Sequence, residues 1–192
     1  MRRKLSLLFS IVPVVLILDF WSKSWALREL QGQAPQELLG GLIPLTFALN
    51  TGAAFGLSIG GGDSRWFFVP VTIIALGLLA VLFKQADKAD GLRLVSLSFV
   101  VAGAVGNLWD RVRWSRGVVD FIGPVDLGFW DFPIFNVADI AISCGAVLLA
   151  ISFWQEERAL AASANSPEAE SSDPGNPSDD PADANPVSSP AP

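Results

Sequence analysis

Four long apolar segments separated by polar connections set the pattern of the chain. They run from Leu5 to Trp25, Trp66 to Phe83, Leu92 to Trp109 and Ile134 to Trp154. A helix rises about 1.5 Å per residue, so each segment is long enough to cross a hydrocarbon core about 30 Å thick. Each begins or ends at a tryptophan, which favours the interface between membrane and water. The pattern therefore predicts an all-α membrane protein with four transmembrane helices.

The connection between the first two segments, residues 29–65, has a different character. It is rich in glycine and proline and contains the short apolar run Gly41-Leu-Ile-Pro-Leu-Thr-Phe-Ala-Leu49. Short apolar runs bounded by glycine are more typical of strands than of a helix. We expect one or two strands here, which would form a small β element on the membrane surface between helices 1 and 2.

The C-terminal residues, 159–192, consist mainly of alanine, serine, proline, aspartate and asparagine and include no aromatic residue. A segment of this composition cannot bury enough apolar surface to offset the entropy lost on ordering. We therefore divide the chain into a membrane domain, residues 1–158, and a disordered acidic tail, residues 159–192. Truncation after Arg158 is expected to leave folding nearly unchanged.

The tail also accounts for the net charge of −6. Residues 156–192 hold eight acidic residues and one arginine, a balance of −7, whereas the remainder holds 11 acidic and 12 basic residues, a balance of +1. The membrane domain thus has no excess of basic charge typical of nucleic-acid binding, and we expect no nucleic-acid partner.

Basic residues indicate the orientation in the membrane. They flank the start of the first segment and fill the short connection between the second and third: Arg2, Arg3, Lys4, Lys84, Lys88 and Arg93. By the positive-inside rule both places lie on the cytoplasmic side, and so do both termini. The alternative is a cleaved signal peptide ending near Ser24-Trp25-Ala26, but Asp19 and Lys23 just before that site argue against it.

Residue counts limit the chemistry. The chain is 51% hydrophobic, has no histidine and contains a single cysteine, Cys144. These counts exclude a Ser-His-Asp triad, a histidine-ligated zinc and an intramolecular disulfide. Acid–base chemistry must then use aspartate, glutamate, lysine or water, and we expect neither a metal nor another cofactor.

Two apolar segments carry polar residues at the end that this orientation makes extracytoplasmic. Asp19 and Lys23 are four residues apart on one face of the first helix, where a structural ion pair is the favoured interpretation. Asn136 and Asp139 share a face of the fourth helix, and Asp139 has no basic residue four positions away. Because an ionisable group in an apolar helix is costly, we interpret Asp139 as functional.

Asp120 lies in the connection before the fourth segment, within the apolar run Val118-Val-Asp-Phe-Ile122. If this run returns to the helices, Asp120 meets Asp139, and two carboxylates at close range share a proton. The alternative is an ordinary carboxylate in a solvated loop, like Asp126 and Asp131. The pattern of residues alone leaves these two interpretations equally open.

Four separated motifs carry a resemblance to a known family. They are Asp19-Phe-Trp-Ser-Lys23, Asn50-Thr-Gly-Ala-Ala-Phe-Gly56, Gly103-Ala-Val-Gly-Asn107 continuing through Asp110-Arg111 to Gly117-Val-Val-Asp120-Phe121, and Phe132-Pro-Ile-Phe-Asn136-Val-Ala-Asp139. In this order, over about residues 5–155, the chain resembles bacterial signal peptidase II, the lipoprotein signal peptidase, an intramembrane aspartic protease. The stretch between Arg111 and Asp120 is longer by a residue than the family pattern.

The resemblance implies roles for particular residues. Asp120 and Asp139 would form the catalytic dyad. Substrate-binding and supporting residues would be Asn50, Gly103, Asn107, Arg111 and Asn136, with Asp19 and Lys23 as structural support. It also implies a β-cradle built from the first extracytoplasmic connection.

The resemblance further implies a hydrolase of the bacterial inner membrane, with its active site near the extracytoplasmic face. Its substrate would be a diacylglyceryl-modified prolipoprotein, cleaved just before the lipidated cysteine, with membrane lipids as the other partners. We expect a monomer. The rival prediction is a small proton or ion translocator using Asp19, Lys23 and Asp139, but these groups cluster at one end of the helices and no internal repeat is visible.

Overall fold

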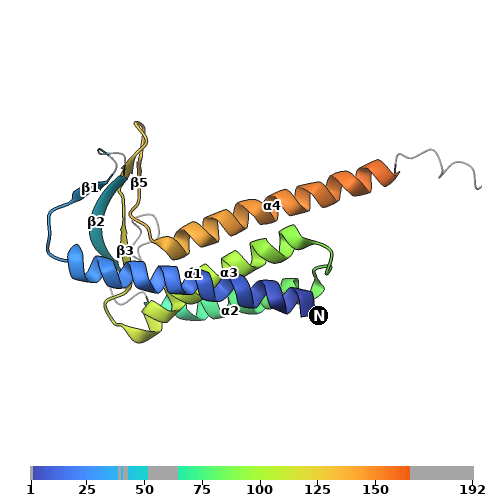
Figure 1. Cartoon of the computed structure of the whole chain (residues 1–192), viewed down its shortest axis with the longest axis horizontal. Helices are drawn as coiled ribbons and strands as arrows, with labels where there is room; N and C mark the ends of the chain where they lie inside the picture. The colour runs from blue at the N-terminus through green and yellow to red at the C-terminus, as the bar shows by residue number, and fades with distance from the viewer. Residues whose placement is uncertain (1, 39, 41–42, 52–64, 165–192) are drawn as a thin grey trace, which may run out of the picture. The chain divides into compact units, whose positions relative to one another are not determined.

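The computed structural model describes residues 2–38, 40, 43–51 and 65–164 (Figure 1). In chain order the elements are α1 (Arg2–Glu29), β1 (Gln36–Leu38), β2 (Ile43–Asn50), α2 (Arg65–Gln85), α3 (Gly91–Arg113), β3 (Val118–Ile122), β4 (Val125–Asp126), β5 (Asp131–Phe132) and α4 (Val137–Ala164). The chain divides into two units, residues 1–154 and 155–192. Everything described below about the site belongs to the first unit.

The four predicted membrane helices are confirmed: α1, α2, α3 and α4 are each long and apolar enough to cross a membrane. The fourth helix begins at Val137 rather than at the predicted Ile134. The reason is that Phe135 and Ile122 exchange backbone hydrogen bonds of 2.9 Å, which keep the chain extended up to Asn136. At its other end α4 runs past the predicted boundary at Arg158, since residues 159–164 are mostly alanine and favour a helix. The rest of the tail, residues 165–192, lies outside the described residues, so its disorder stays a prediction.

Helix α3 is the central support, because α1 and α2 both pack against it. Two glycines on α3 allow close approach of its neighbours. A Cβ atom at Gly103 would lie 2.7 Å from Ile142 Cγ1 of α4, and one at Gly106 would lie 2.7 Å from Asp19 Oδ2 of α1. Small residues let membrane helices pack backbone to backbone, so α3 brings the polar ends of α1 and α4 together.

The predicted β element is present, but it draws strands from two connections. Strands β1, β2 and β3 form an antiparallel sheet in that order, so the strand after α3 pairs with β2, which lies between α1 and α2 in the chain (Figure 1). Successive side chains of a strand point to opposite faces. Val119 and Phe121 pack with Ala26 and Leu30 at the end of α1, which turns Asp120 to the other face.

Candidate active site

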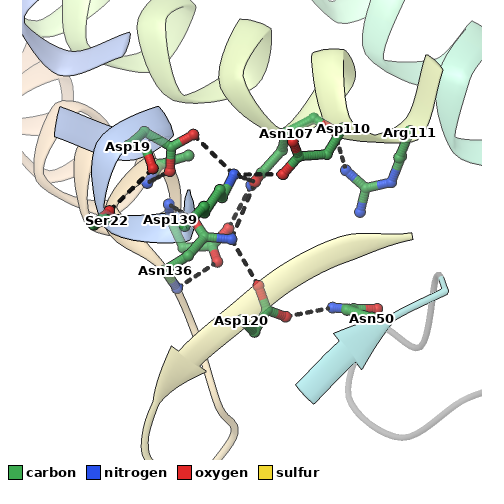
Figure 2. Close-up of polar contacts among 11 residues, drawn as sticks. Asp19, Ser22, Asn50, Asn107, Asp110, Arg111, Asp120, Asn136 and Asp139 are labelled. Carbon is green, nitrogen blue, oxygen red and sulfur yellow. Dashed lines mark hydrogen bonds and ion pairs between the residues drawn. The ribbon is translucent and has the colours of Figure 1, made fainter. Parts of the chain in front are cut away.

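Asp120 is held in the sheet by two amide donors. Its Oδ1 accepts a hydrogen bond of 2.6 Å from Asn136 Nδ2, and its Oδ2 accepts one of 3.0 Å from Asn50 Nδ2 (Figure 2). Ala48 lies opposite Asp120 in the β2–β3 pair, so Asn50 reaches the aspartate diagonally across the strands. With 3% of its surface exposed, Asp120 is a buried carboxyl group and not a solvated loop residue.

A glycine lets the two strands meet closely at this point. Gly117 has φ of +91°, and a Cβ atom there would lie 2.7 Å from the carbonyl carbon of Asn50 and 2.9 Å from Thr51 Cα. Both the backbone conformation and the space exclude a side chain. Gly117 therefore places Asn50 where its amide reaches Asp120.

We expect Gly117→Ala to lower kcat at least tenfold, because the new methyl group displaces Asn50 from Asp120. The matched control is Gly128→Ala, since Gly128 also has positive φ, +81°, but has open space around its Cα. It carries the same backbone strain without the steric clash. Equal turnover by the two purified variants would contradict the positioning role of Gly117.

Asp139 is part of the cap at the start of α4. Its backbone N–H donates to Asn136 Oδ1 at 3.0 Å, and its own Oδ2 accepts from the backbone N–H of Asn136 at 3.1 Å. This reciprocal pair is a capping box, which satisfies donors that the first turn of a helix otherwise leaves free. The capping hydrogen bonds of α4 thus fix the position of the Asp139 carboxyl group.

Asn107 of α3 connects this cap to a buried cation. Its Nδ2 donates to Asp139 Oδ1 at 2.7 Å, and its Oδ1 accepts from Lys23 Nζ at 3.0 Å and from Asn136 Nδ2 at 3.1 Å. An ammonium group only donates hydrogen bonds, so Lys23 requires the oxygen of Asn107 on its side. The amide nitrogen of Asn107 is thereby directed at Asp139.

Lys23 in turn lies between two buried carboxylates. Its Nζ is 2.8 Å from Asp19 Oδ2, which confirms the predicted ion pair, and 2.9 Å from Asp110 Oδ2 as a second ion pair. Asp19 Oδ1 also accepts from the backbone N–H of Ala138 at 3.0 Å, so this cluster contacts the first turn of α4. No role was predicted for Asp110, although its position three residues after Asn107 places both on one face of α3.

Two other predicted residues lie at the margin of the site. Arg111 donates from Nη1 to the backbone oxygen of Asn107 at 3.3 Å, and its Cζ lies 5.3 Å from the ring centroid of Phe68. Its buried Nε has no hydrogen-bond partner within the described residues. Gly103 contacts the backbone of Ala138, so it supports the helix that carries Asp139.

Burial, followed by the nearby carboxylate of Asp139, raises the pKa of Asp120 from its ordinary value of 3.8 to about 6, although the amides of Asn50 and Asn136 lower it. The folded protein therefore keeps a proton on Asp120 that the unfolded chain releases between pH 3.8 and about 6. It follows that this group's contribution to folding stability falls as pH rises through that window, by up to about 3 kcal/mol.

We expect the infrared C=O band of a protonated carboxyl group to titrate near pH 6 in the wild type and to be missing from Asp120→Asn. The same substitution should remove part of the loss of stability between pH 4 and 6. Asp126→Asn, at an exposed strand position, serves as the control and should leave the band unchanged. A band that disappears near pH 4 would show that Asp120 titrates like a solvated carboxylate.

The structure thus brings together seven of the predicted residues: Asp19, Lys23, Asn50, Asn107, Asp120, Asn136 and Asp139. Asn136 contacts both aspartates, and five elements, α1, α3, α4, β2 and β3, each supply part of the cluster (Figure 2). Among residues 2–38, 40, 43–51 and 65–164, no group of three acidic, cysteine or histidine side chains has the spacing of a metal site. Most of the motif after Asn50, including Phe55, lies outside the described residues.

Comparisons with known proteins identify the family of this chain. The family model for signal peptidase (SPase) II matches residues 11–155. The lipoprotein signal peptidase of Maridesulfovibrio salexigens is 38% identical over 147 residues, covering 75% of this chain and 92% of that protein. The enzyme of the same name from Pseudomonas paraeruginosa is 38% identical over 149 residues, covering 77% and 88%. A solved bacterial membrane enzyme superposes with a TM-score of 0.69 at 31% identity, covering 78% of this chain and 88% of that one. The chain belongs to the signal peptidase II family.

Proposed function

We propose that this chain is a membrane aspartic endopeptidase that removes the signal peptide from diacylglyceryl-modified prolipoproteins, cutting just before the lipidated cysteine. The observation that carries this proposal is the contact of Asn136 with both Asp120 and Asp139. It links two carboxyl groups from separate elements, the buried Asp120 and the half-buried Asp139, in a chain whose family consists of signal peptidases. Family membership makes the chain a hydrolase, whereas ion translocation is not favoured.

In the first step of the proposed reaction, Asp120 and Asp139 share one proton. The ionised carboxylate takes a proton from water as the water oxygen attacks the scissile carbonyl carbon. The protonated carboxyl group donates its proton to the carbonyl oxygen, which becomes a hydroxyl group of the tetrahedral intermediate. The raised pKa of Asp120 supports its role as the group that begins protonated.

In the second step the C–N bond breaks. The carboxyl group that accepted the water proton delivers it to the leaving nitrogen of the lipidated cysteine, while the other carboxylate regains a proton from the intermediate. The Nε–H of Arg111, which has no hydrogen-bond partner within the described residues, is available to a peptide carbonyl of the substrate and would hold the peptide in line. Asn50, Asn107 and Asn136 keep the two carboxyl groups in place throughout.

The substrate's acyl chains need apolar surface close to the elements that carry the two aspartates. A groove of about 610 Å³ lies between the sheet, α1 and the start of α4, and is lined by Trp25, Leu45 and Phe135 among others. Phe121 and Ile140 also line it, and because Phe121 and Asp120 point to opposite faces of β3, the groove lies behind the strand that carries the aspartate. We assign the diacylglyceryl group to this groove, where each buried methylene contributes about 0.8 kcal/mol.

The orientation of the proposed enzyme in the membrane follows from its basic residues. The basic residues of the first helix and of the α2–α3 connection favour cytoplasmic termini, with the dyad at the opposite end near the extracytoplasmic face. The chain would act as a monomer, since all the polar groups of the cluster come from one chain.

The test is cleavage of a synthetic signal-peptide substrate by the purified full chain in detergent, with and without a diacylglyceryl group on the cysteine. We expect cleavage before the lipidated cysteine and none of the unmodified peptide. Turnover should withstand a chelator and the Cys144→Ala substitution, because the proposed nucleophile is water activated by carboxyl groups. Failure to cleave the lipidated peptide would contradict the proposal. Loss of activity in the chelator that zinc restores would contradict it as well.

A further inference from the structure

A second apolar groove lies at the other end of the helices, away from the aspartates. It has a volume of about 740 Å³ and is bounded by α1 and α2 with Val101 of α3 at its base. Its wall is formed by Leu5, Leu8, Leu76, Ala80 and Phe83, and three lysines complete the lining: Lys4, Lys84 and Lys88. The start of α1 and the end of α2 meet here (Figure 1).

One of these lysines is fixed by the backbone. Lys4 is 9% exposed, and its Nζ donates to the backbone oxygens of Phe83 at 3.2 Å and Lys84 at 2.9 Å, the last carbonyls of α2. A cation at the negative end of a helix is stabilised there. Two of the three ammonium donors are thus used by residues that the structure describes, and the third is available to a ligand in the groove.

The surroundings of the groove are strongly positive. Six basic residues gather in the start of α1 and around the α2–α3 connection, against two acidic ones: Arg2, Arg3, Lys4, Lys84, Lys88 and Arg93 against Asp87 and Asp90. Neither aspartate lines the groove. Both interact with residues of their own connection: Asp90 Oδ2 lies 3.2 Å from Arg93 Nε, and Asp87 Oδ1 accepts a hydrogen bond of 2.7 Å from the Ala89 N–H. Within the described residues, none of the three lining lysines has a carboxylate within ion-pair distance.

We propose that this groove binds an anionic phospholipid, with an acyl chain along the apolar wall between α1 and α2 and the phosphate at Lys4, Lys84 and Lys88. Basic pockets between membrane helices are suited to anionic headgroups. A free phosphate ion would leave the apolar wall uncovered. A signal peptide is a poor fit, because its N-terminal region is positively charged and would meet three ammonium groups.

The test measures lipid retained by the purified full chain in a neutral detergent, by native mass spectrometry, together with its Tm. Phosphatidylglycerol and phosphatidylcholine with identical acyl chains are compared, and inorganic phosphate is added in a separate arm. Lys84→Gln/Lys88→Gln removes two exposed charges and leaves Lys4 in place. Arg113→Gln/Arg116→Gln removes two exposed charges beside Trp114, outside the groove, and is the matched control.

We expect phosphatidylglycerol to be retained and to raise Tm, with the lysine variant retaining it roughly thirtyfold more weakly and the arginine variant binding like the wild type. Ala80→Trp, which fills the groove without changing its charge, should also reduce retention. Equal binding of phosphatidylcholine, or equal loss in the arginine variant, would overturn the proposal. A Tm rise of the same size with inorganic phosphate would also overturn it, because the ligand would then be a phosphate ion. A lipid-free dimer in light scattering would overturn it as well, because the groove would then bind a second copy of the chain.

Discussion

Replacement of Asp120 or Asp139 by asparagine is expected to lower kcat by roughly 10³-fold to 10⁴-fold while leaving substrate binding largely intact. The amide has nearly the size of the carboxyl group, but it neither takes a proton from water nor shares one with its partner. Because the two groups act as one unit, the double variant should be little slower than either single variant. Turnover of a lipidated peptide and binding of an uncleaved analogue measure the two effects.

Asn at either position is expected to preserve the fold, so loss of activity would report chemistry. Asp139 would keep its cap, because an asparagine oxygen still accepts from the backbone N–H of Asn136. The controls are Asp126→Asn and Asp131→Asn on the β4–β5 hairpin, whose carboxyl groups are exposed and should be dispensable. If the Asp120→Asn variant stays active while Asp126→Asn or Asp110→Asn is inactive, the dyad has been assigned to the wrong residue.

Those parts of the structure that depend on local sequence were predictable. The four membrane helices follow from apolar runs, because length and composition alone decide whether a segment crosses a membrane. The ion pair of Asp19 and Lys23 follows from a spacing of four residues on a helix. Strand β2 followed from its short apolar run between glycines.

Other features depend on contacts between distant segments and were not predictable from pattern. Strand β3 exists because Asp120 and its neighbours pair with β2, some 70 residues earlier in the chain. The short run Val118–Ile122 carries no signal of that partner. Gly117 is one of 17 glycines, and its role follows only from its close approach to Asn50 in the structure.

The role of Asp110 was hidden for a similar reason. A carboxylate next to Arg111 and Arg113 at the end of a helix has the sequence pattern of an ordinary exposed residue. Its burial, with 6% exposed, becomes evident only when α1 packs on α3 and places Lys23 against it. Thus the motifs predicted which residues cluster together, whereas the contacts of Asp110 that support the cluster depend on the packing of the helices.

That support leads to the second large expected effect: Lys23→Met should lower the free energy of unfolding by about 3–5 kcal/mol, the usual cost of breaking a buried ion pair from one side. Methionine is close to lysine in length, so packing is largely kept. The loss arises because Asp19 and Asp110, 3% and 6% exposed, are left buried without their shared cation. Unfolding of the purified variant by denaturant in detergent measures it, and Arg113→Met, at an exposed position at the end of α3, is the control.

The triple variant Asp19→Asn/Lys23→Met/Asp110→Asn separates charge from packing. With both carboxylates made neutral, the uncompensated charge is gone, and we expect at least half of the lost stability to return. Asn at position 19 still accepts from the Ala138 N–H, so the first turn of α4 stays held. Turnover should remain well below wild type, because Asn107 has lost the ammonium group that directs its amide nitrogen at Asp139. If the triple variant is no more stable than Lys23→Met, Lys23 stabilises the fold through packing and not through its charge. If the triple variant is fully active, Asn136 alone suffices to orient Asn107.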